Sequence, residues 1–132
     1  MTDTAATRPY GVLGRVLGHS YTPTIYKELA GLEYVRFERE PEDLEAFMTG
    51  DEWEGTNVTI PYKQRIFDYL DDVSEEATRI GAVNCVRRDG GRLTGFNTDI
   101  EGIRLSLRLL LGDDLPEAAL VLGTGGASFT TI

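Results

Sequence analysis

Residues 10–39 read YGVLGRVLGHSYTPTIYKELAGLEYVRFER, and this stretch decides the fold class. The apolar run Tyr10–Gly14 predicts a buried strand. After a turn, Thr22 is the expected cap of a helix with Pro23 at its first position, and Gly31 ends that helix. Alternation of apolar and polar residues in Tyr34–Arg39 predicts a second strand. A strand, a helix and a strand in succession favour two parallel strands in one sheet.

The same alternation continues along the chain. We predict a helix over Pro41–Thr49, a third strand over Asn57–Ile60, a short helix near residues 66–70 and another from Ser74 to Ile80. Two glycines at positions 90 and 91 predict a tight antiparallel hairpin between strands at 82–87 and 92–96. A helix over 99–111 follows, and its expected inner face consists of Ile100, Ile103, Leu107, Leu110 and Leu111. The expected fold is a three-layer α/β/α domain with a mostly parallel sheet and an antiparallel edge hairpin.

The composition restricts the class of partner. The chain has 132 residues, enough for one domain with a core, and its 13 Lys and Arg against 22 Asp and Glu give a net charge of −9. This charge argues against nucleic acid or an anionic membrane surface as a partner. Cys85 is the single cysteine, and no apolar run fits a signal peptide or a membrane span, so we expect a cytoplasmic protein. No cluster of residues has the spacing of a metal site, so no metal is expected.

Four short motifs become informative when they are taken together. They are Gly18-His19-Ser20-Tyr21-Thr22-Pro23, Asn57-Val58-Thr59-Ile60-Pro61-Tyr62-Lys63, Gly81-Ala82-Val83-Asn84 and Gly95-Phe96-Asn97-Thr98-Asp99. Their order and spacing resemble those of the shikimate dehydrogenase family, and the resemblance runs from about Tyr10 to Ser128. It implies an oxidoreductase that interconverts 3-dehydroshikimate and shikimate with NADP, in the pathway to the aromatic amino acids.

The resemblance also implies roles for particular residues. Lys63 and Asp99 match the catalytic pair, in which an ammonium donates a proton and a carboxylate orients it. The expected contacts with shikimate are Ser20, Thr22, Thr59, Lys63, Asn84 and Asp99. Thr22 stands where the family usually has a second serine for the carboxylate of the substrate. Taken alone, Lys63 has the competing interpretation of a surface lysine, and Asp99 that of a helix cap. Asn97 is expected to shape the loop before Asp99.

The last part of the chain is expected to begin a second domain. Ala118–Leu122 predicts a strand, and the motif after it resembles the start of an NADP-binding Rossmann domain, with cofactor contacts at Gly123, Gly125, Gly126 and Ala127. Only five residues follow Ala127, whereas a complete βαβ unit takes about 30 residues, so no phosphate-binding helix is expected. The expected organisation is therefore a flexible N-terminus at 1–8, a substrate-binding domain at 9–111, and a linker with a truncated Rossmann start at 112–132.

Two interpretations stay open from these residues. In the first, the chain is the substrate-binding half of a shikimate dehydrogenase and binds no NADP and catalyses no hydride transfer by itself. In the second, it is a stand-alone module that binds shikimate or quinate without catalysis. In either case the apolar segment 119–122 is expected to be disordered, to fold back on the domain, or to be buried against a second copy in a homo-oligomer.

Overall fold

The opening stretch folds as a strand, a helix and a strand. The computed structural model describes residues 7–114 and 116–132, and it places β1 at Tyr10–Gly14, α1 at Thr22–Ala30 and β2 at Tyr34–Glu38. β1 and β2 are parallel neighbours, with Tyr10 opposite Tyr34. Part of the expected flexible N-terminus (residues 1–6) and residue 115 of the expected linker lie outside the described residues.

The sheet has six strands in the order β2-β1-β3-β5-β6-β4 within the described part of the chain. The remaining strands are β3 (Gly55–Val58), β4 (Asp72–Val73), β5 (Cys85–Asp89) and β6 (Arg92–Phe96). β5 runs against its neighbours β3 and β6, and the other pairings are parallel. The expected hairpin is β5–β6, and Gly90 and Gly91 adopt φ of 55° and 86°, which glycine tolerates without strain. The two-residue strand β4, which the pattern did not predict, lies outside this hairpin and forms the edge.

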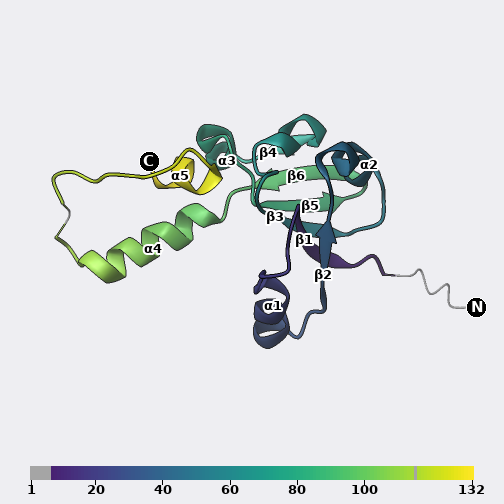
Figure 1. The fold of residues 1–132 in the computed structure, drawn as a ribbon, viewed down its shortest axis with the longest axis horizontal. Coiled ribbons are helices and arrows are strands. Elements are labelled where there is room, and N and C mark those ends of the chain that lie inside the picture. Colours follow the sequence, from purple (N-terminus) through teal and green to yellow (C-terminus); the bar gives the residue numbers. More distant parts are fainter. Residues whose placement is uncertain (1–6, 115) are drawn as a thin grey trace, which may run out of the picture.

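Helices lie on both sides of the sheet. Figure 1 shows α2 (Leu44–Thr49) and α3 (Glu75–Ile80) on one side and α1 on the other. Two 3-10 turns, η1 (Pro41–Asp43) and η2 (Arg65–Tyr69), stand where helix starts were expected. The side chain of Ser74 caps α3 by accepting a hydrogen bond from the backbone N–H of Ala77. Between the sheet and α2 lies a core that includes Leu13, Phe37, Leu44, Phe47, Met48, Trp53, Val58, Tyr62 and Ile66.

The helix α4 (Asp99–Leu111) has the predicted bounds but not the predicted inner face. None of its residues is buried, and Leu107 and Leu110 are 43% and 78% exposed. Figure 1 shows the reason, because α4 extends away from the sheet and lies beside the short helix α5 (Gly126–Thr131). An apolar stripe is buried only where another element covers it. Across residues 7–114 and 116–132, no helix is long and apolar enough to cross a membrane.

The C-terminal segment differs from its expected structure in two ways. The predicted strand Ala118–Leu122 is absent, because no strand pairs with it, and Leu120 and Leu122 are each 85% exposed. The helix that was not expected after the glycines is present as α5, which begins at Gly126. Thr130 of α5 is buried, so this part of the tail folds back on the domain. Association of two copies through residues 119–122 stays a prediction.

Candidate active site

The topology brings the motif residues to one edge of the sheet. β1, β3 and β6 run in the same direction, so the loops that follow them leave the sheet at the same edge. β5 runs the opposite way, so the segment that enters it begins at this edge. In an open α/β sheet, the edge at the carboxyl ends of the parallel strands is where ligands bind. The residues at this edge are Ser20 and Thr22 after β1, Thr59 and Lys63 after β3, Asn84 before β5, and Asp99 after β6.

Lys63 and Asp99 form a close ion pair at this edge. Lys63 Nζ lies 2.5 Å from Asp99 Oδ2, and the two side chains are only 17% and 32% exposed. The segment of Lys63 is held by Tyr62, whose buried hydroxyl donates to the carbonyl oxygen of Arg39. The backbone oxygen of Lys63 also accepts a hydrogen bond of 2.7 Å from Val83 N. These contacts fix an ammonium and a carboxylate against each other, and Lys63 is therefore not the free surface lysine of the competing interpretation.

Two asparagines hold Asp99 in place. Asn84 Nδ2 donates to Asp99 Oδ1 at 2.9 Å, and Asn84 Oδ1 accepts the backbone N–H of Thr98 at 2.9 Å. Asn97 Oδ1 accepts the backbone N–H of Asp99 at 3.0 Å, while Asn97 Nδ2 donates to the carbonyl oxygen of Ala82. Asp99 is consequently the first residue of α4 and not its cap, and Asn97 shapes the loop before it as predicted. Both asparagines are 7% exposed, so their side-chain amides form hydrogen bonds with this loop and have little contact with solvent.

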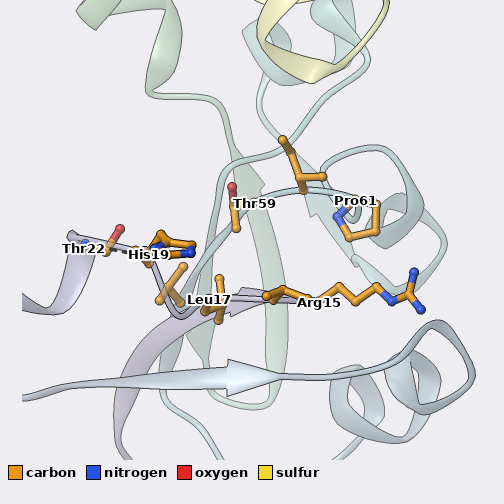
Figure 2. A pocket seen from close by; sticks show the side chains of 10 residues that line it. Arg15, Leu17, His19, Thr22, Thr59 and Pro61 are labelled. Carbon is orange, nitrogen blue, oxygen red and sulfur yellow. Dashed lines mark hydrogen bonds between the residues drawn. The ribbon is translucent and has the colours of Figure 1, made fainter.

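The hydroxyl-bearing residues line two adjoining cavities. A cavity of about 520 Å³ is lined by Ser20, Thr22 and Thr59, and a second of about 300 Å³ by Thr22, Thr59, Lys63, Asn84 and Asp99, so that two threonines belong to both. Figure 2 shows Thr22 and His19 on one side of the larger cavity, Arg15 and Pro61 on the other, and Thr59 between them. The six residues therefore line two adjoining cavities, together called the recess, although their individual roles stay predictions.

Neither Ser20 nor Thr22 is the cap residue of α1. Tyr21 occupies the cap position of α1, and no side chain caps it there. Ser20 Oγ accepts a hydrogen bond of 3.4 Å from Thr22 N, while Thr22 is already the first helical residue. The prediction that Thr22 caps α1 is therefore wrong. In the turn before the helix, the side chain that accepts a backbone hydrogen bond is Ser20. Thr22 lines both cavities of the recess.

Sequence reasoning assigned no role to Asn57, which the structure places in the smaller cavity. Asn57 Oδ1 is buried and has no hydrogen-bond partner among the described residues, whereas most buried polar atoms have one. It lies on β3 opposite Val12 and Cys85. An asparagine inside a predicted strand was the available signal, because asparagine is depleted in strands. Tyr26 and Thr98 also line this cavity without a predicted role.

The cysteine at this site is not suited to nucleophilic catalysis. Cys85 lies beside Asn84, but burial raises the pKa of its thiol, which keeps it protonated and unreactive at neutral pH. His19 lines the larger cavity, as does Ser20. The arrangement instead suits proton transfer by Lys63 to an oxygen atom of a small, polyhydroxylated molecule. Among the described residues, no three His, Cys, Asp or Glu side chains gather as metal ligands do.

The glycine-rich segment 123–127 approaches the same site. Gly123 has φ of 126°, a conformation that favours glycine, and a β-carbon on it would lie 2.8 Å from Ser128 Oγ. Gly125 has open space where a side chain would stand. This bare backbone fits the close approach of a phosphate group that a dinucleotide needs. Gly126 differs, because it faces Lys63 and Ala82.

Comparison with known proteins identifies the family of this chain. The family model described as the shikimate dehydrogenase substrate binding domain matches residues 12–86, more than half of the chain. This chain belongs to the shikimate dehydrogenase family. The shikimate dehydrogenase (NADP(+)) of Bacillus subtilis is 45% identical over 136 residues, which cover 93% of this chain and 48% of that protein.

Solved shikimate dehydrogenase structures have the same fold. Shikimate dehydrogenase 1 from Peptoclostridium difficile superposes with a TM-score of 0.83 at 38% identity, over 94% of this chain and 49% of that one. The Thermus thermophilus enzyme, in complex with NADP(H) and shikimate, gives a TM-score of 0.80 at 38% identity, over 94% of this chain and 50% of that one. The chain thus spans about half the length of the shikimate dehydrogenases that it matches.

Proposed function

We propose that this chain is the substrate-binding half of an NADP-dependent shikimate dehydrogenase and that the complete protein interconverts 3-dehydroshikimate and shikimate. The observation that carries the proposal is the Lys63–Asp99 pair, 2.5 Å apart and open to a recess lined by hydroxyl and amide groups. Residues 9–111 are assigned to the substrate-binding domain, and residues 112–132 to a linker and the beginning of the NADP-binding domain. Membership of the family supports this assignment of the two residue ranges.

In the proposed mechanism, Lys63 donates or accepts the proton that is transferred to or from the substrate oxygen. Reduction of a ketone adds a hydride to carbon and a proton to oxygen, and NADPH, when bound, supplies the hydride. The Lys63 ammonium donates its proton to the ketone oxygen as negative charge develops there, and it recovers a proton from solvent. In the reverse direction, neutral Lys63 takes the proton of the substrate hydroxyl.

Asp99 and its partners orient the reacting groups. One carboxylate oxygen of Asp99 binds Lys63 and the other accepts from Asn84, so the carboxylate cannot rotate away from the recess. In this position Asp99 can also accept a hydrogen bond from a ring hydroxyl of the substrate. Fixed geometry of this kind lowers the barrier, because the reacting groups lose no further freedom in the transition state.

The other end of the recess suits the carboxylate of the substrate. Ser20 and Thr22 place hydroxyl groups there, at the start of α1. The first turn of α1 has no acidic residue, so the partial positive charge of its N-terminus is not neutralised locally. Thr59 lines the recess between this end and Lys63. A ring that carries a carboxylate on one side and hydroxyls on the other would thus meet complementary groups along its length.

Turnover by the complete protein tests the proposed function. We expect NADP-dependent oxidation of shikimate, measured from the absorbance of NADPH, with quinate assayed in parallel to define the specificity. Residues 1–132 alone are expected to show no stoichiometric binding of NADPH in calorimetric titration, because the chain spans only half of its relatives. Binding of shikimate by the complete protein without any turnover would contradict the proposal and would favour a binding module.

Replacing Ser20 by alanine tests the carboxylate contact. A hydrogen bond to a charged group is worth roughly 1.5–3 kcal/mol, so we expect Ser20→Ala to weaken shikimate binding by roughly 10–100-fold in the complete protein. The matched control is the methyl ester of shikimate, which lacks the negative charge and should bind wild type and variant with similar affinity. Calorimetry gives both dissociation constants. An equal loss of affinity for acid and ester would show that Ser20 does not bind the carboxylate.

A further inference from the structure

The glycine-rich segment touches Lys63 at a single residue. A β-carbon built on Gly126 would lie 3.0 Å from Cδ and 3.3 Å from Cβ of Lys63, and 3.6 Å from Cβ of Ala82. Ordinary contacts between carbon atoms are about 3.5–4.0 Å, so the two contacts with Lys63 are too short for any residue larger than glycine without movement. The backbone of Gly126 itself does not require glycine, because its φ lies outside the left-handed range.

The stem of Lys63 has little freedom to move away. A free lysine stem would rotate to relieve such a contact, but Lys63 Nζ is bound to Asp99, and Asp99 is bound in turn by Asn84. α5 is also anchored on its other side. Thr130 is 6% exposed, and its hydroxyl accepts from Asn97 Nδ2 at 3.4 Å and donates to the carbonyl oxygen of Gly126 at 2.9 Å. α5 is thus seated against Lys63 at its start and, near its end, against Asn97, which binds the backbone N–H of Asp99.

We propose that Gly126 is a positioning residue for Lys63: its missing side chain lets the start of α5 pack against the lysine stem and keep the ammonium on Asp99. This assignment differs from the expected contact of Gly126 with the cofactor. The expected effect of Gly126 on turnover rests on the proposed function. The expected effect on the Lys63–Asp99 ion pair rests only on the geometry. Gly125, the preceding glycine, keeps the role of a bare backbone beside the cofactor.

Gly125 provides the matched control. Its φ of −84° and ψ of 176° are accessible to alanine, and a β-carbon on Gly125 meets no atom within 4 Å. Gly125→Ala and Gly126→Ala therefore add the same methyl group to neighbouring positions, and only the second collides with Lys63. A difference in the chemical reactivity of Lys63 between the two variants measures that collision, because this readout does not depend on the cofactor.

The rate of chemical labelling of Lys63 measures whether its ammonium is still paired with Asp99, and this measurement does not require enzymatic activity. Lys27 is the other lysine of this sequence, and its exposed side chain, paired with Glu33, serves as an internal reference. We expect Gly126→Ala, in the complete protein, to raise the rate of acetylation of Lys63 relative to Lys27 by roughly 10-fold, as for loss of one charge-assisted hydrogen bond. Mass spectrometry of the two peptides gives the ratio. Gly125→Ala should leave this ratio at the wild-type value.

Kinetics supply the second readout. Because misplacement by about 1 Å can cost about 100-fold in rate, a shift of a few tenths of an ångström in Lys63 should lower kcat by roughly 10-fold in Gly126→Ala with KM for NADP little changed. An unchanged labelling ratio, or a rise in KM for NADP alone, would overturn the positioning role. A raised labelling ratio in a protein that shows no oxidation of shikimate would uphold the positioning of Lys63 and contradict only the proposed function.

Discussion

Replacing Lys63 by alanine in the complete protein is expected to lower kcat for shikimate oxidation by about 10²–10⁴-fold, the usual contribution of a general acid–base group. The variant loses the ammonium that donates or accepts the proton at the substrate oxygen. Asp99→Asn is expected to act in the same direction, because the amide keeps the shape of the carboxylate but no longer pairs with the charge of Lys63 at 2.5 Å. Steady-state kinetics at saturating shikimate and NADP measure both effects.

Lys27→Ala is the matched control for this experiment. Lys27 lies on α1 in an exposed ion pair with Glu33, and exposed pairs contribute little to stability. We expect its kcat to equal that of the wild type. Circular dichroism should show that the Lys63 and Asp99 variants remain folded, because neither side chain belongs to the apolar core. Near-normal turnover in both site variants would refute the catalytic assignment.

Replacing Trp53 by alanine is expected to give the largest loss of stability, about 3–5 kcal/mol in the free energy of unfolding. Trp53 is fully buried, and its ring stacks on Phe47 with centroids 5.5 Å apart. The guanidinium of Arg88 lies 4.2 Å from the ring centroid on the face of the indole. Removal of the side chain leaves a cavity that the surrounding strands and α2 cannot fill.

Trp53→Phe separates packing from hydrogen bonding. The indole Nε1 donates to the carbonyl oxygen of Phe47 at 2.9 Å, and phenylalanine keeps much of the ring but leaves this oxygen unpaired. The expected loss is about 1–3 kcal/mol. Tyr21→Ala, at a side chain that is 77% exposed, should change stability little. Urea unfolding followed by circular dichroism is the measurement, and equal stability of the Trp53→Ala variant and the wild type would contradict the structural role.

Local signals in the sequence were sufficient for most of the elements. The hairpin turn at Gly90 and Gly91 and the cap at Ser74 depend on interactions within a few residues, so they could be predicted without the fold. The bounds of α4 followed in the same way. Predictions failed where a distant partner decides the outcome. The apolar stripe of α4 is not buried because the sheet does not cover it, and Ala118–Leu122 forms no strand because no strand among the described residues pairs with it. The error at Thr22 is local, because the helix cap falls one residue earlier, at Tyr21.

The same distinction between local signals and long-range contacts applies to the candidate site. The motifs alone identified Lys63 and Asp99, because the order and spacing of the segments are characteristic of the family. Only the tertiary structure decided that these side chains meet at 2.5 Å, that Asn84 binds Asp99 from another segment, and that Gly126 lies against Lys63. Periodicity and turn chemistry act between neighbours in sequence, whereas these contacts join residues 15 to more than 60 positions apart. They exist because strands β1, β3 and β6 end at one edge of the sheet and β5 begins there.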